Sequence, residues 1–313
     1  MANSVTISEV GPRDGLQNCD GIMPTHIKKQ WIEALYNAGL REIEVGSFVP
    51  AKILPQLADT NLVVDYARRF NGLCVAVLVP NAKGAQNAIN AGANKLTLPL
   101  SVSETHSLKN LRRNHAQVIE EAQTISQMIA DLPAKSRPHF EGSLSTLFGC
   151  TLEGPIPGKQ ILRLTEQLLE AGVDEIGLSD TTGYADPNGV REMIKNVRAV
   201  AGAEKVTGIH LHNTRGLGLA NALAALEAGL TTFDASLGGL GGCPFAPGAS
   251  GNIATEDLAF MFESMGVRTN INIESLFAAR SFIKQGLPGE PLYGFTPEAG
   301  LPLGFNQTKG THN

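Results

Sequence analysis

Residues 73–92 read LCVAVLVPNAKGAQNAINAG, and they contain a strand followed by a helix. The run 73–80 is apolar and rich in valine, which favours a buried β-strand. Residues 82–91 have the composition of a helix, and Gly92 follows them. Glycine readily adopts the left-handed conformation that closes a helix before the next strand. This stretch therefore predicts one β-then-α unit.

The same β-then-α unit recurs along the chain. We expect strands at 5–11, 42–48, 73–80, 95–100, 138–147, 175–180, 206–212 and 232–237. We expect helices between them at 25–37, 82–91, 108–131, 158–170, 187–200 and 217–227. Eight such units with buried strands favour a parallel sheet that closes on itself. The predicted fold is therefore a TIM (β/α)8 barrel of the α/β class.

A doubly wound open sheet is the alternative fold. Such a sheet usually has fewer strands, and it carries a glycine-rich GxGxxG turn after the first strand. The corresponding turn in this chain, residues 11–15, reads GPRDG instead. The barrel is therefore the preferred prediction.

The length fits a single catalytic domain. A TIM barrel needs about 250 residues, and this chain has 313. Two further helices, near 256–265 and 273–285, follow the eighth strand, and the segment after them is rich in Gly and Pro. We expect the barrel with its C-terminal helices to occupy residues 1–286 and an irregular tail to occupy residues 287–313.

The composition argues against several classes of protein. The formal net charge is −5 and no basic segment is present, which argues against a nucleic-acid binder. No apolar run is long enough to span a membrane, and the first residues lack the features of a signal peptide. The four cysteines form no CxxC pair and are interpreted as reduced thiols. We expect a soluble, cytoplasmic protein that binds neither nucleic acid nor membrane.

Polar side chains with catalytic potential occur where the expected strands end. They are Arg13, Asp14, Glu44, Asn81, Asp180, His210 and His212. In a TIM barrel the active site is built at the carboxyl ends of the strands. We therefore expect these side chains to gather at one mouth of the barrel.

The pair His210 and His212 predicts a metal site. Side chains two residues apart on a strand point to the same face, so both imidazoles can reach one point. An isolated His-x-His is more often a hydrogen-bonded pair inside the barrel, but here Asp14 is expected opposite. Two imidazoles, a carboxylate and open water positions suit Mg²⁺ or Mn²⁺, with zinc as an alternative.

Two glycine-rich segments flank this expected centre. In the turn 11–15, Arg13 can face substrate oxygens and stabilise an oxyanion, because its guanidinium stays charged. Residues 238–251 contain six glycines and are interpreted as a loop that folds over a ligand. Cys243 in this loop is either a proton donor or acceptor, or an incidental thiol. Asn252 either supplies an oxygen to the metal or caps the helix that begins near Thr255.

With these motifs assembled, the sequence resembles the 3-hydroxy-3-methylglutaryl-CoA lyases. The resemblance runs from Ser8 to about Ser264. Its signatures are EVGPRDGLQN at 9–18, IEVGSFV at 43–49, EIGLSDT at 175–181, HLH at 210–212, GGCP at 241–244 and GNIATED at 251–257. Related barrels that make isopropylmalate or homocitrate share the Arg-Asp-Gly and His-x-His elements but usually lack the cysteine loop.

The resemblance implies a divalent metal, an acyl-CoA substrate and a role for each matching position. The implied metal ligands are Asp14, His210 and His212, with Asn252 in or near the shell. The implied catalytic residues are Arg13 at the enolate oxygen, Cys243 as the loop acid/base, and Glu44 and Asp180 around the substrate hydroxyl. The implied substrate-binding residues are Arg13, Gln17, Gly241 and Gly242. A homodimer is implied by the resemblance alone.

The sequence departs from these lyases after His212. They carry Asp-Thr-Tyr-Gly-Gln there, whereas residues 213–217 read NTRGL. Arg215 either faces a carboxylate or CoA phosphate, or is a solvated residue at the start of a helix, and the second interpretation is favoured. Three alternatives to HMG-CoA cleavage therefore stay open: a citramalyl-CoA lyase that yields pyruvate, a Claisen-type acyltransferase, and a non-catalytic CoA- or metal-binding protein.

Overall fold

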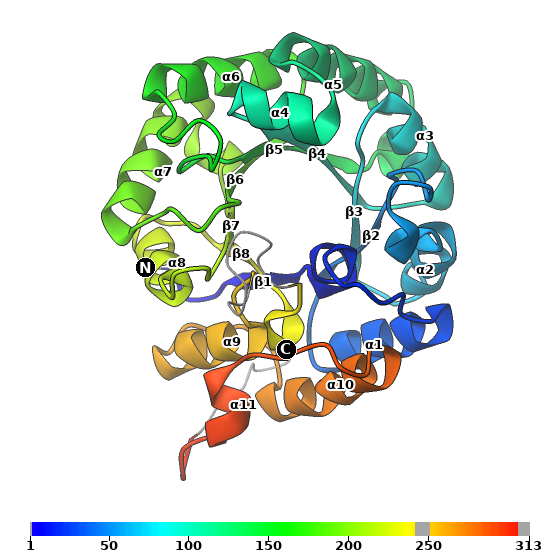
Figure 1. The fold of residues 1–313 in the computed structure, drawn as a ribbon, viewed down its shortest axis with the longest axis vertical. Helices are drawn as coiled ribbons and strands as arrows, with labels where there is room; N and C mark the ends of the chain where they lie inside the picture. The colour runs from blue at the N-terminus through cyan, green and yellow to red at the C-terminus, as the bar shows by residue number, and fades with distance from the viewer. Residues whose placement is uncertain (1, 242–250, 306–313) are drawn as a thin grey trace.

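The computed structural model describes residues 2–241 and 251–305. Its eight strands close into one barrel in sequence order, and every neighbouring pair is parallel, including β8 with β1 (Figure 1). The strands are β1 Thr6–Glu9, β2 Glu42–Ser47, β3 Cys74–Leu78, β4 Lys95–Ser101, β5 His139–Ser145, β6 Glu175–Asp180, β7 Gly208–Leu211 and β8 Thr232–Ala235. The predicted TIM barrel is confirmed.

Helices form a ring around the barrel (Figure 1). They are α1 Thr25–Asn37, α2 Thr60–Ala67, α3 Ala82–Ala91, α4 Glu104–Leu111, α5 His115–Ala130, α6 Gly158–Glu170, α7 Pro187–Ala201 and α8 Gly218–Glu227. After β8 come α9 Thr255–Ser264, α10 Ile273–Gly286 and α11 Phe295–Ala299. The short turns are η1 Gly11–Gly15, η2 Pro55–Leu57, η3 Ala134–Ser136, η4 Ala203–Lys205 and η5 Leu237–Gly239. No helix in the described part of the chain is long and apolar enough to cross a membrane.

Alternation along the strands separates an apolar layer from a polar barrel interior. In β2, Ile43 and Val45 are buried in the hydrophobic core, whereas Glu42 and Glu44 point to the other face and meet charged partners from β4 and from the turn after β1. Successive side chains of a strand point to opposite faces, so this pattern is what two differently solvated faces require. TIM-barrel interiors are usually filled by branched apolar residues. In this barrel, charged side chains occupy part of the interior and are available for chemistry.

One predicted helix is wrong in its extent. The expected helix 108–131 is two helices, α4 and α5, because Arg112 adopts a left-handed conformation with φ of 54°. Asn114 then starts α5 with a reciprocal capping box to Gln117. A capping box satisfies backbone donors that a new helix exposes at its start. The chain therefore turns sharply between α4 and α5 instead of continuing as one helix.

The C-terminal segment is not irregular throughout, which corrects the prediction for residues 295–299. The carboxylate of Asp257 accepts hydrogen bonds from the backbone N–H groups of Phe295 and Thr296, at 3.0 and 2.7 Å. These two bonds tie the start of α11 to α9. The backbone N–H of Tyr293 also donates to the carbonyl of Gly238, at 2.7 Å. The segment therefore packs at the end of β8, beside the mouth of the barrel.

Candidate metal centre and active site

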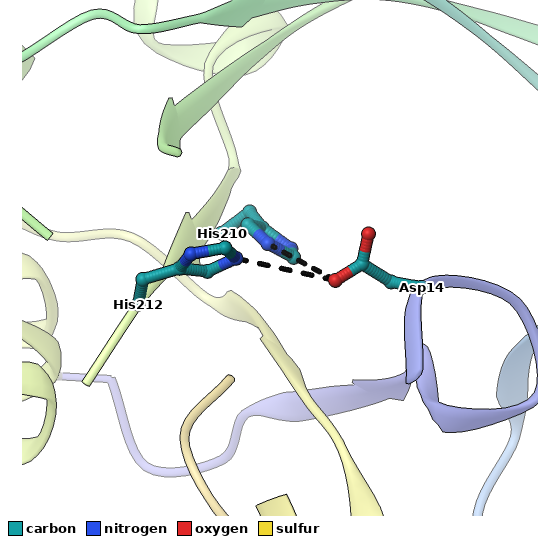
Figure 2. A group of neighbouring side chains, drawn as sticks. All are labelled: Asp14, His210 and His212. Carbon is teal, nitrogen blue, oxygen red and sulfur yellow. Dashed lines mark ion pairs between the residues drawn. The ribbon is translucent and has the colours of Figure 1, made fainter. Parts of the chain in front are cut away.

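Three predicted ligands converge at the carboxyl end of the barrel. Asp14 lies in η1, directly after β1, while His210 lies on β7 and His212 follows its end. Figure 2 shows the three side chains pointing toward one another. The Nε2 atom of each imidazole is 4.0 Å from Asp14 Oδ2, and one ligand atom from each residue lies within 4.8 Å of the others. The predicted meeting of these groups is confirmed.

The geometry of this cluster fits a divalent cation. At 4.0 Å the imidazole nitrogens are too far from Asp14 Oδ2 for hydrogen bonds. The three atoms nevertheless face a common point. One carboxylate oxygen and two imidazole nitrogens form a donor set that magnesium, manganese and zinc all accept. The residues therefore fit the implied metal, although they do not distinguish among these ions.

The protonation states of Asp14 and His212 suit metal ligands, whereas the pKa of His210 is raised by Asp234 and Asp14 against the effect of burial. Burial alone would raise the pKa of Asp14, but Arg13 and the two imidazoles lower it well below its usual range. Burial, together with the charge of His210, lowers the pKa of His212 to about 4. At neutral pH Asp14 is thus anionic and His212 is neutral. A metal ligand must be deprotonated, and these two already are.

Arg13 and Glu44 form a buried ion pair beside the cluster. Arg13 Nε donates to Glu44 Oε2 at 2.5 Å, and Arg13 Nη1 donates to Asp14 Oδ1 at 2.6 Å. Burial raises the pKa of Glu44 to about 7, although Arg13 opposes this shift. Glu44 Oε1 is buried and has no hydrogen-bond partner among the described residues. Glu44 therefore has a free oxygen that can exchange a proton near neutral pH.

Gln17, Asn252 and Gly241 lie around Asp14. Gln17 Nε2 donates to Asp14 Oδ1 at 2.7 Å, and Asn252 Nδ2 donates to Asp14 Oδ2 at 2.8 Å. The residue that caps α9 is Ala254, so the interpretation of Asn252 as a helix cap is wrong. Gly241 has a φ of 92°, and a Cβ there would lie 2.6 Å from the Cα of Gly15. Only glycine fits this close approach.

The comparisons with known proteins agree with this geometry. A family model described as HMGL-like matches residues 4–283. The chain belongs to the HMGL-like family. The hydroxymethylglutaryl-CoA lyase of Bacillus subtilis is 42% identical over 288 residues, which cover 92% of this chain and 94% of that protein. The human mitochondrial hydroxymethylglutaryl-CoA lyase is 38% identical over 287 residues, which cover 92% of this chain and 87% of that protein.

Solved structures of related proteins support the same assignment. A structure of an HMG-CoA lyase from Acinetobacter baumannii, in complex with coenzyme A and 3-methylmalate, is 40% identical with a TM-score of 0.89. It covers 98% of this chain and 98% of its own chain. The HMG-CoA lyase structure from Bacillus subtilis also gives a TM-score of 0.89 at 40% identity, covering 96% of this chain and 99% of its own. The resemblance read from the motifs is therefore confirmed at the level of the family.

Two residues of the predicted HMGL-like site cannot be placed. Gly242 and Cys243 lie outside the described residues, so their roles in substrate binding and proton transfer stay predictions. Asp180 is described, and its carboxylate accepts hydrogen bonds from the backbone N–H groups of Tyr184 and Ala185, at 2.8 and 3.1 Å. Burial raises the pKa of Asp180 to about 6, against the effect of these two bonds. In the structure, Asp180 holds the loop after β6 through these two bonds. A role at the substrate hydroxyl stays a prediction.

Arg215, where this sequence departs from the lyases it resembles, is exposed and lies just before the start of α8. Its Nη1 donates to the carbonyls of Thr182 and Gly183, both at 3.0 Å. Its guanidinium also lies 4.6 Å from the centre of the Tyr184 ring, within cation–π range. The favoured interpretation of Arg215 as a solvated residue near a helix start therefore agrees with the structure, which adds these contacts to it. Arg215 joins the loop after β7 to the loop after β6, at the rim of the site.

Sequence reasoning missed two carboxylates of this HMGL-like site, of which Glu9 is buried and Asp234 is half-buried. Glu9, at the end of β1, accepts hydrogen bonds from the N–H groups of Gly11 and Leu237 and from the hydroxyl of Thr255, at 2.9, 2.8 and 2.6 Å. Burial raises its pKa to about 8. Asp234 on β8 lies 3.1 Å from His210. The available signal was their alternation with apolar residues on predicted strands, which indicates an inward-facing acid.

Proposed function

We propose that this protein is a divalent-metal-dependent lyase that cleaves 3-hydroxy-3-methylglutaryl-CoA to acetyl-CoA and acetoacetate. The observation that carries the proposal is the convergence of Asp14, His210 and His212 beside the Arg13–Glu44 ion pair. Membership of the HMGL-like family supports it, as do relatives that are named HMG-CoA lyases.

The proposed reaction breaks one carbon–carbon bond and moves one proton. The tertiary hydroxyl of the substrate loses its proton, and its carbon becomes the ketone carbon of acetoacetate. The bond to the acetyl-CoA carbon breaks, and its electron pair forms the enolate of acetyl-CoA. Protonation of that enolate gives the second product. The protein must therefore accept a proton at one point and stabilise a thioester oxyanion at another.

The chain offers a candidate for each task. Glu44 Oε1 has no partner among the described residues, and a pKa of about 7 suits a group that accepts the hydroxyl proton. The guanidinium of Arg13 stays charged, because its pKa is raised by Glu44 and Asp14 against the effect of burial. We assign it to the enolate oxygen, where a fixed cation stabilises charge as it develops. Cys243 is the candidate that returns the proton to the enolate.

Asp14, His210 and His212 would hold the metal, with Asn252 beside them. A bound divalent cation would supply Lewis-acid polarisation of the substrate oxygens. Mg²⁺ or Mn²⁺ is the proposed ion, and zinc is the alternative. We further propose a cytoplasmic location and a homodimer, and the acyl-CoA thioester is the expected partner of the site.

Product identity tests the proposal. Purified protein with Mg²⁺ or Mn²⁺ would be given 3-hydroxy-3-methylglutaryl-CoA and citramalyl-CoA in separate reactions. We expect acetoacetate and acetyl-CoA in equal amounts from the first thioester, with the higher kcat/KM. A higher kcat/KM for citramalyl-CoA, with pyruvate as product, would assign the protein to the rival lyase. Release of CoA from acetyl-CoA and a 2-oxo acid, without either cleavage, would indicate an acyltransferase.

A further inference from the structure

Asp234 lies directly beside one of the three metal-ligand residues. The strands β7 and β8 are parallel neighbours, and their register places His210 opposite Asp234. Phe233 and Ala235 flank Asp234, are buried in the core and face outward, and Phe233 packs on Phe262 of α9 at 4.8 Å between ring centres. Alternation then directs Asp234 into the barrel. Its inward position is thus fixed by the packing of its two neighbours.

The carboxylate of Asp234 contacts the edge of the His210 ring that faces away from the cluster. Asp234 Oδ2 is 3.1 Å from His210 Nδ1, whereas His210 Nε2 is 4.0 Å from Asp14 Oδ2. The two nitrogens lie on different edges of the imidazole. A carboxylate that accepts a hydrogen bond from Nδ1–H therefore leaves the lone pair on Nε2. It also sets the direction in which that lone pair points, which is toward Asp14.

His212 provides the internal contrast. Its Nε2 is also 4.0 Å from Asp14 Oδ2. Its ring, however, contacts the backbone of Thr181 and, among the described residues, no carboxylate other than that of Asp14. Of the two imidazoles, only His210 has a carboxylate behind it. The structure therefore gives His210, but not His212, a carboxylate that can fix the orientation of its ring.

We propose that Asp234 is a positioning residue that fixes the tautomer and orientation of His210 for cation binding. This inference rests on the proposed function, because it assumes that the cluster of Asp14, His210 and His212 binds a divalent cation. A carboxylate behind a metal-binding histidine raises the basicity of the ring and holds it in place. Loss of such a partner typically weakens metal binding by about 10- to 100-fold. The same loss is expected in Asp234→Ala.

Binding of Mn²⁺ alone to metal-free protein tests the proposal without relying on turnover. We expect Asp234→Ala to bind Mn²⁺ about 10- to 100-fold more weakly than wild type. Asp234→Asn keeps a side-chain oxygen that accepts the bond from Nδ1–H, so it should recover part of that loss. Glu141→Gln is the matched control, since Glu141 is another partly buried acid of the barrel interior, on β5, and it pairs with Lys95 instead of a histidine.

The outcomes separate this inference from the proposed function. Equal Mn²⁺ affinity of wild type and Asp234→Ala would overturn the role of Asp234 and leave the metal site intact. Absence of Mn²⁺ binding by wild type would overturn the metal site itself.

The tautomer in the wild-type protein gives a second test that does not depend on a variant that folds. Nitrogen NMR of His210 in metal-free protein, at a pH where the ring is neutral, should show the proton on Nδ1. A neutral ring with the proton on Nε2 would contradict the proposal.

Discussion

The barrel contains two buried charged clusters, one at each end, and they differ in how completely their atoms are paired. At the amino end, Lys95 Nζ lies 2.8, 3.3 and 3.4 Å from carboxylate oxygens of Glu141, Glu175 and Glu42. These four residues come from four strands, so the cluster joins β2, β4, β5 and β6. At the carboxyl end, by contrast, a carboxylate oxygen of Glu44 is buried and has no hydrogen-bond partner in the described part of the chain.

This difference indicates that the amino-end cluster has a structural role and that the carboxyl-end cluster is available for chemistry. Burial alone would lower the pKa of Lys95, but the surrounding carboxylates raise it, so this cation stays charged. Its charge is then balanced inside the protein. The carboxyl-end cluster instead leaves Glu44 Oε1 without a hydrogen-bond partner among the described residues, and it holds Asp14 Oδ2 and His210 Nε2 4.0 Å apart. In a TIM barrel the amino end contributes stability, and the carboxyl end carries function.

The largest effect is expected from breaking the amino-end cluster. Lys95→Met leaves three carboxylates in a buried site without their cation, and removing one member of a buried charge network typically costs about 3–5 kcal/mol. Urea denaturation should show this loss in the free energy of unfolding, while kcat per folded molecule stays close to wild type. Lys159→Met, at an exposed position on α6, is the control and should change stability by less than about 0.5 kcal/mol. A normal stability for Lys95→Met would remove the structural half of the comparison.

A change in the carboxyl-end cluster should instead lower activity while the protein stays folded. Arg13→Met removes the proposed oxyanion stabiliser, and loss of one such donor typically lowers kcat by about 100- to 1,000-fold. Steady-state assays should show at least this fall, while circular dichroism shows a folded barrel that unfolds cooperatively. Arg13→Lys should also be impaired, because an ammonium cannot contact Glu44 and Asp14 with the geometry of the guanidinium. Near-normal turnover of Arg13→Met would refute its assignment.

A pH-dependent change in stability, smaller per pH unit, is expected from Glu9, which joins η1 to the end of β8. Its pKa is raised to about 8 in the folded state, above the ordinary value of 4.5. Between these values the folded protein binds the extra proton, so the contribution of Glu9 to stability falls as pH rises toward 8. Glu9→Gln cannot titrate. Its stability relative to wild type should therefore increase with pH, by at most about 1.4 kcal/mol per pH unit.

Denaturation of both proteins between pH 5 and pH 9 measures that difference. The two stability curves should diverge with increasing pH up to about 8 and then run parallel. Curves that are parallel over the whole range would show that Glu9 is ionised in the folded protein.

Local patterns in the sequence predicted the barrel and the candidate metal ligands. The strand and helix repeat is visible because many units, such as 73–92, carry their own apolar run and closing glycine. The pair His210 and His212 is visible because their spacing on one strand already places them together. Both signals lie within a few neighbouring residues and do not require knowledge of barrel closure.

Contacts between distant strands were not predictable in the same way. Lys95 meets its three carboxylates only because the closed barrel brings β2, β4, β5 and β6 together. Asp234 is a single acid on a strand, with no spacing that connects it to His210. The break between α4 and α5 depends on a left-handed Arg112, a conformation that arginine seldom adopts. Each of these features is set by tertiary contacts.

Removal of divalent ions tests whether the cluster of Asp14, His210 and His212 supports cleavage through a bound cation. Protein treated with a chelator and then freed of it would be assayed for cleavage of 3-hydroxy-3-methylglutaryl-CoA before and after addition of Mg²⁺ or Mn²⁺, beside Asp14→Asn. We expect no turnover by either protein without metal. Adding the ion should restore turnover by the wild type and restore little or none in Asp14→Asn. Full activity of the wild-type protein in chelator would contradict this role of the cluster.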